Sequence, residues 1–256
     1  MTFKHIRIIL LLLIMAYIGA DTYLNNKRAT DWKWPIRIVV YPINADGSET
    51  SEKHIKQLKN THFDNINDVL VSQSKRYGRD LTEPLDIQLA PQLHAIPPKI
   101  PAKRSGLAIF WWSLKLRYWA WSTDNYKGPK PQIKAYALYF SPETNPSLKH
   151  STGLKKAKLS LNYLFASTEQ TEQNKVVVLH EILHTLGATD KYDLRNGYPF
   201  FPEGFANSQQ KPLFPQSKAE IMGGRIAISN TEATIPNDLN TLVIGPKTAK
   251  EIGWID

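Results

Sequence analysis

The chain has 256 residues, of which 42% are apolar and 21% charged, a composition typical of a globular rather than a disordered protein. It contains no cysteine, so it forms no disulfide, and any zinc site must use His, Asp, Glu or Tyr ligands. The formal net charge of +9 suits an anionic surface. The sequence holds no nucleic-acid-binding motif, and we expect no nucleic acid as a partner.

The N-terminus has the layout of a membrane-targeting segment. Lys4 and Arg7 precede an uninterrupted apolar run over residues 8–20, which is typical of a secretory signal. The run is shorter than the roughly 20 residues that span a bilayer, and Gly19 and Ala20 are small residues near a cleavage point. An uncleaved anchor that attaches the chain to the inner membrane through residues 8–20 is the alternative. Either interpretation predicts an exported protein, periplasmic or secreted.

Residues 1–24 are therefore assigned to the signal or anchor, and residues 25–34 to a polar linker. The folded part begins with a strand over residues 36–41, which Pro42 is expected to end. A helix is then expected over residues 50–77, because its apolar residues follow a helical period.

Thr50 or Ser51 would cap this helix, and Gly78 would terminate it. Residues 85–89 alternate between apolar and polar side chains and predict a second strand. The proline-rich stretch over residues 91–101 predicts a loop.

The next segment, residues 107–121, is unusually aromatic, and only Lys115 and Arg117 in it are charged. We expect a helix that is mostly buried. A helix lying in a membrane interface is the alternative, since tryptophan and basic side chains suit that environment. The tryptophans of this segment are Trp111, Trp112, Trp119 and Trp121.

Residues 133–140 and 158–166 predict two further strands, and a helix follows that begins at Thr171 or Asn174. A last helix is expected over residues 246–254. Strands that alternate with helices indicate an α/β (α+β) fold with a mixed sheet, followed by a loop-rich C-terminal part that ends in a helix.

A candidate metal site lies in the helix that follows residue 171. His180 and His184 are four residues apart, so both imidazoles lie on one face of a helix and can bind one ion. Glu181 points to a neighbouring side, where it can hold a water rather than the ion. Gly187 is placed to stop the helix in a left-handed turn, and the returning chain can deliver Asp190 as a third ligand.

The pattern from His180 to Asp190, His-Glu-x-x-His-x-x-Gly-x-x-Asp, resembles the zinc-binding consensus of the metzincin peptidases. The Asp form is similar to the snapalysin-like branch and, more loosely, to immune-inhibitor-like peptidases. Metzincins also carry a methionine-containing turn beneath the zinc, and residues 220–224 resemble that turn, with Met222 as its methionine.

This resemblance implies a zincin-like twisted sheet, one catalytic Zn²⁺ held by His180, His184 and Asp190, and Glu181 as the catalytic base for peptide hydrolysis. Gly187 and Met222 would support the site. The resemblance also implies an upper subdomain over residues 35–187, a lower one over 188–256, and an edge strand at 158–166 that pairs with an extended peptide substrate. Asp193 and Tyr192 remain alternatives for the third ligand, and further transition-state contacts could come from His94, His150, Tyr192 or Glu203.

Two other functions remain open at this stage. A non-catalytic zinc-binding envelope protein would keep the ligands but has no need of Glu181. A zinc amidase that acts on cell-wall peptide would use the same residues, and the basic net charge would suit an anionic wall polymer.

Overall fold

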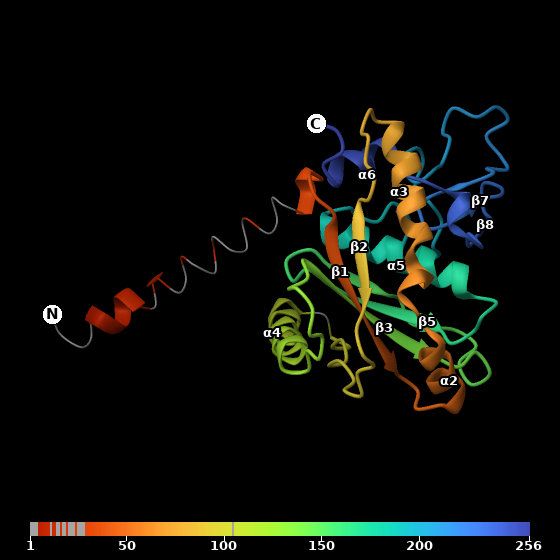
Figure 1. The fold of residues 1–256 in the computed structure, drawn as a ribbon. Coiled ribbons are helices and arrows are strands. Elements are labelled where there is room, and N and C mark those ends of the chain that lie inside the picture. The colour runs from red at the N-terminus through yellow and green to blue at the C-terminus, as the bar shows by residue number, and fades with distance from the viewer. Residues whose placement is uncertain are drawn as a thin grey trace.

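The computed structural model describes residues 5–10, 12–13, 16, 19, 24, 29–103 and 105–256. Its centre is a five-stranded mixed sheet with helices on both faces (Figure 1). The predicted α/β (α+β) class with a mixed sheet is confirmed. The strands of the sheet are β1 (Ile36–Asn44), β2 (Leu85–Leu89), β3 (Ile133–Phe140), β4 (Thr152–Leu154) and β5 (Leu159–Phe165).

The two longest helices lie on opposite faces of the sheet, and the others are shorter. They are α2 (Glu49–Gln57), α3 (Asn65–Lys75), α4 (Gly106–Ser122), α5 (Thr171–Leu186) and α6 (Pro246–Glu251), with 3-10 turns η1 (Asn60–Phe63) and η2 (Leu239–Thr241). Short strands pair within the C-terminal part. These are β6 (Ala219–Glu220), β7 (Ile226–Ala227), β8 (Ala233–Thr234) and β9 (Leu242–Val243).

The strand order in the sheet is β2-β1-β3-β5-β4. The first four strands are parallel, and β4 pairs antiparallel with β5. The strand expected as the substrate-binding edge, β5, therefore does not lie at the edge along its whole length. Its first residues, Leu159–Leu161, are covered by β4.

Alternate residues of the strands enter two separate hydrophobic clusters. In β1, Ile38 and Val40 face a core formed with α2, α3 and α5, whereas Val39 and Tyr41 face a core formed with α4. Strands buried on both faces account for the near-continuous apolar sequence of β1 and β3. Figure 1 shows α4 on one side of the sheet, with α3 and α5 on the other. The core on the α5 side continues into the C-terminal part through Met222 and other residues.

The expected helix over residues 50–77 is wrong as a single element. Ser48, not Thr50 or Ser51, caps α2, and the chain is extended at Leu58 before η1 and α3. The break lets side chains of this segment form hydrogen bonds with the outer strand β2. Asn60 accepts a hydrogen bond from the Leu89 N–H at 2.8 Å, and the Asn67 amide bonds both the N–H and the carbonyl of Leu85. These side chains satisfy backbone groups that an edge strand would otherwise leave unpaired.

Pro42 does not end β1, which continues to Asn44. Proline lacks an N–H, but its carbonyl accepts the N–H of Leu93 at 2.9 Å, and Pro42 stays in register with Ala137 of β3. The helix α3 ends at Lys75, and the turn after it runs to Gly78, whose left-handed φ of 69° stops the helix close to the predicted position.

The helix α4 is not mostly buried, contrary to the expectation. Only Trp112, Leu116 and Ala120 are buried, because one face of α4 packs on the sheet and the described residues place no further layer over the other. Trp111 and Trp121 are 59% and 73% exposed.

The predicted signal segment, residues 1–24, falls largely outside the described residues. Among the residues that the structure does describe, no helix is both long enough and apolar enough to cross a membrane. The end of the expected linker is part of the fold: Ala29 and Trp32 are buried, and Trp32 Nε1 donates to the carbonyl of Ile252 at 2.7 Å. Trp32 also packs edge-on against Trp254, with ring centroids 5.7 Å apart.

We therefore predict that Trp32→Ala lowers the free energy of unfolding by about 3–5 kcal/mol, because it leaves a cavity against Trp254. Trp34→Ala is the matched control: Trp34 is 79% exposed, and its removal should change stability by no more than about 0.5 kcal/mol. Urea denaturation followed by circular dichroism measures both. Equal stability of the two variants would show that residues 29–32 are not part of the folded domain.

Candidate metal centre

The helix α5 carries the candidate residues on one side, which faces Gly153 of β4 and the turn at Ile221. Its opposite side, which includes Leu179, Ile182 and Leu183, is fully buried. The helix ends at Gly187, where φ is 126°, a conformation that side-chain-bearing residues rarely adopt. This confirms the predicted helix stop, and it turns the chain back toward the two histidines.

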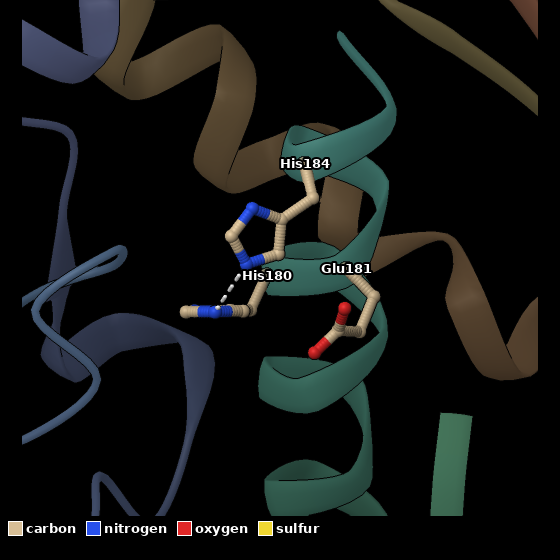
Figure 2. Close-up of side chains that lie close together, drawn as sticks. All are labelled: His180, Glu181 and His184. Atoms are coloured by element: carbon tan, nitrogen blue, oxygen red, sulfur yellow. Dashed lines mark hydrogen bonds between the residues drawn. The ribbon is translucent and has the colours of Figure 1, made fainter. Parts of the chain in front are cut away.

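Three side-chain atoms converge beside α5. His180 Nε2 lies 3.1 Å from His184 Nε2, and Asp190 Oδ1 lies 3.1 Å from each of these nitrogens. Figure 2 shows the two imidazoles projecting from the same side of the helix and meeting at these atoms. The structure therefore brings together all three residues that the sequence predicts as ligands.

The far nitrogens of both imidazoles are held by backbone carbonyls. His180 Nδ1 lies 2.8 Å from the carbonyl oxygen of Ile221, and His184 Nδ1 lies 2.9 Å from that of Ala188. A carbonyl only accepts, so each Nδ1 carries the proton and donates it. In the neutral rings each Nε2 then presents a lone pair to the centre, the tautomer that a metal-binding histidine needs.

The acidic groups of the centre favour positive charge at these atoms. Although burial opposes the charged form of His180, the Asp190 carboxylate and Glu181 raise its pKa to about 8. Burial likewise acts against the ionised form of Asp190, but the two histidines beside it hold the pKa of that carboxyl well below its usual range. The cluster attracts positive charge, which a proton on His180 or a bound cation would supply.

Glu181 lies within 4.8 Å of both imidazoles but is placed differently from Asp190. The residue is 5% exposed, and the Gly153 N–H on β4 lies close enough to its carboxylate to favour the ionised form. One carboxylate oxygen, Oε2, is buried without a hydrogen-bond partner. Burial raises the pKa of Glu181. Asp190, at 3.1 Å, is therefore the better third ligand, and Glu181 has a free oxygen for another task.

Close contact between β4 and α5 makes this position of Glu181 possible. A Cβ atom at Gly153 would lie 2.4 Å from the backbone carbonyl oxygen of Glu181 and 2.5 Å from the Cβ of His184. Only glycine allows the two backbones to approach so closely.

The turn that contains Met222 supports the site through its contact with His180. Met222 is fully buried, and the neighbouring carbonyl of Ile221 is the one that orients His180. Glu220 is also fully buried, and four donors bond its carboxylate at 2.7–3.0 Å. The donors are the backbone N–H groups of Met222, Gly223 and Gly245 and the hydroxyl of Thr248.

A cavity of about 540 Å³ opens beside the three acceptor atoms, and His180, Glu181 and Tyr192 contribute to its wall. Burial and the Asp190 carboxylate raise the pKa of Tyr192, so its hydroxyl stays protonated at neutral pH. Much of the remaining lining is apolar, including Leu148, Tyr163, Phe165, Val176, Val177 and Ile235.

The other candidate residues lie in different surroundings. Asp193 pairs with Arg195 at 2.6 Å, away from the histidines. His150 lines the cavity, whereas His94 and Glu203 are exposed and do not. Sequence reasoning missed the supporting roles of Glu220 and Gly153. A charged residue next to the apolar pair Ile221–Met222 was a signal for the first, but no local signal marks the second.

No model of a known protein family matches the chain, and no curated protein matches it significantly.

We predict that Glu220→Gln lowers the free energy of unfolding by about 2–4 kcal/mol. The new amide group would place a donor against the donors that now surround the carboxylate. Glu203→Gln, the same change at an exposed position, should leave stability unchanged in the same denaturation experiment. A Glu220→Gln protein as stable as the parent would contradict the role given to this carboxylate.

Proposed function

We propose that the protein is a zinc-dependent peptidase of the metzincin type. The observation that carries the proposal is the set of three acceptor atoms, 3.1 Å apart, on His180, His184 and Asp190. The unpartnered buried oxygen of Glu181 beside them supports catalysis rather than structural metal binding.

The donor set suits zinc. Two imidazole nitrogens and one carboxylate oxygen are common zinc ligands. Ligand atoms about 2.0–2.1 Å from a tetrahedral ion are about 3.3 Å apart, close to the observed 3.1 Å. Three protein ligands leave a fourth position open, as in catalytic zinc sites.

A bound zinc ion would supply Lewis-acid chemistry, polarising the scissile carbonyl and acidifying a water molecule. Glu181 takes the proton of the attacking water on Oε2 and passes it to the leaving amine nitrogen. Tyr192, which is protonated at neutral pH and borders the cavity, is a candidate donor to the developing oxyanion.

The apolar lining of the cavity favours a peptide substrate with a large apolar side chain next to the cleaved bond. A non-catalytic metal-binding role would not explain why a buried carboxylate oxygen of Glu181 has no hydrogen-bond partner.

Zinc binding should depend on pH through His180, whose pKa is about 8 in the metal-free protein. Below that pH the imidazole carries a proton that zinc must displace, so the association constant should fall by about tenfold per pH unit. Above pH 8 this group should add no further dependence. Competition with a chromogenic chelator between pH 6 and 9 measures the effect, and a flat profile below pH 8 would contradict it.

The direct test of catalysis is Glu181→Gln, which keeps the size of the side chain but removes the base. We expect zinc content by elemental analysis to stay near one ion per chain, while cleavage of a broad peptide library falls by at least about 100-fold. His184→Ala is the companion variant, and it should lose both the zinc and the cleavage activity. Undiminished cleavage by Glu181→Gln would exclude the mechanism, and a parent protein that binds no zinc would exclude the metal centre.

A further inference from the structure

The helix α4 has two apolar faces, and the protein covers only one of them. Trp112, Leu116 and Ala120 pack against the sheet on the side opposite α5. The outer side chains recur every three or four residues, so they lie on one face along the whole helix. This α4 face consists of Leu107, Phe110, Trp111, Leu114, Tyr118 and Trp121, each between 42% and 75% exposed.

A continuous exposed apolar face of this length marks an interaction surface. Three of its residues, Trp111, Tyr118 and Trp121, combine an apolar ring with one polar group. Such side chains concentrate at the boundary between lipid tails and head groups, where the ring is buried and the polar group stays hydrated.

Basic residues border the α4 face on both sides. At 100° per residue, Lys115 and Arg117 lie on opposite edges of the stripe, and both are exposed. From this position long basic side chains reach head-group phosphates while their stems cover apolar surface. The Arg117 side chain donates a 2.9 Å hydrogen bond to the carbonyl of Lys156, which fixes its position.

The sequence around α4 is almost free of acidic residues. Residues 95–130 contain seven Lys or Arg and one acid, Asp124, a net charge of 7 − 1 = +6. Asp124 itself is bound to Lys134 at 2.6 Å and to the Tyr41 hydroxyl at 2.8 Å. This segment of the chain therefore combines apolar and positive residues, a combination that complements an anionic lipid surface.

We propose that the α4 face lies on an anionic lipid bilayer, with the aromatic stripe in the interface and Lys115 and Arg117 on the head groups. The sheet then stands between the bilayer and α5, so the candidate metal centre lies on the side away from the lipid. The inference rests on α4 and its surroundings alone and does not depend on the proposed catalytic function.

The absence of cysteine allows a local test on the full chain. A single cysteine at Tyr118→Cys or Leu107→Cys would carry an environment-sensitive NBD fluorophore. Phe201→Cys, at a 60% exposed aromatic residue outside α4, is the matched control. Vesicles of phosphatidylglycerol and phosphatidylcholine in equal parts should blue-shift both α4 labels, and lipids with nitroxides in their acyl chains should quench them. The label at position 201 should respond to neither.

Charge and alternative occupants are tested with the same labels. Lys115→Gln together with Arg117→Gln should raise the lipid concentration at half-maximal response by about fivefold per charge removed, and pure phosphatidylcholine should give a much weaker response. Labels that stay in water on vesicle-bound protein would overturn the proposal. So would α4 labels that are shielded without lipid and cross-link between two chains, because a second copy would then cover this face.

Discussion

The candidate site is built on three atoms that carry lone pairs and lie 3.1 Å apart, on His180, His184 and Asp190. The carbonyls of Ile221 and Ala188 accept hydrogen bonds from the Nδ1–H groups of the two histidines, so both Nε2 atoms face the Asp190 carboxylate. Such a cluster repels itself unless positive charge lies between its members. Without metal that charge is a proton, which is why the pKa of His180 is raised. We propose that zinc supplies the charge in the working protein.

The fold holds these atoms by tying the returning chain to distant elements. The buried Lys191 and the partly buried Glu251 form an ion pair at 2.8 Å, and Glu251 also accepts hydrogen bonds from the backbone N–H and the hydroxyl of Thr189. These contacts fasten the segment that carries Asp190 to α6. On the other side, the Glu220 carboxylate fixes the turn that presents the Ile221 carbonyl. The loop-rich C-terminal part is therefore ordered around the centre by buried charges rather than by long strands.

Much of this could be predicted from local sequence patterns. The strands at 85–89 and 133–140 have the predicted bounds, since alternation and apolar runs are local signals. The histidine spacing, Gly187 and the distance to Asp190 are also local. The break within residues 50–77 was missed because its cause lies in another element. It places Asn60 and Asn67 where their side chains form hydrogen bonds with the backbone of the edge strand β2. The exposure of α4 was missed because apolar content alone does not show which face another layer covers.

The ligands of the zinc ion can be identified by zinc K-edge X-ray absorption of the zinc-loaded full chain. We expect a four-coordinate ion with two imidazole nitrogens and two oxygens, at about 2.0–2.2 Å. In Asp190→Asn the oxygen part of the signal should change while both imidazoles remain. A spectrum with no imidazole contribution, or one that changes with Glu181→Gln but not with Asp190→Asn, would show that His180, His184 and Asp190 do not hold the ion together.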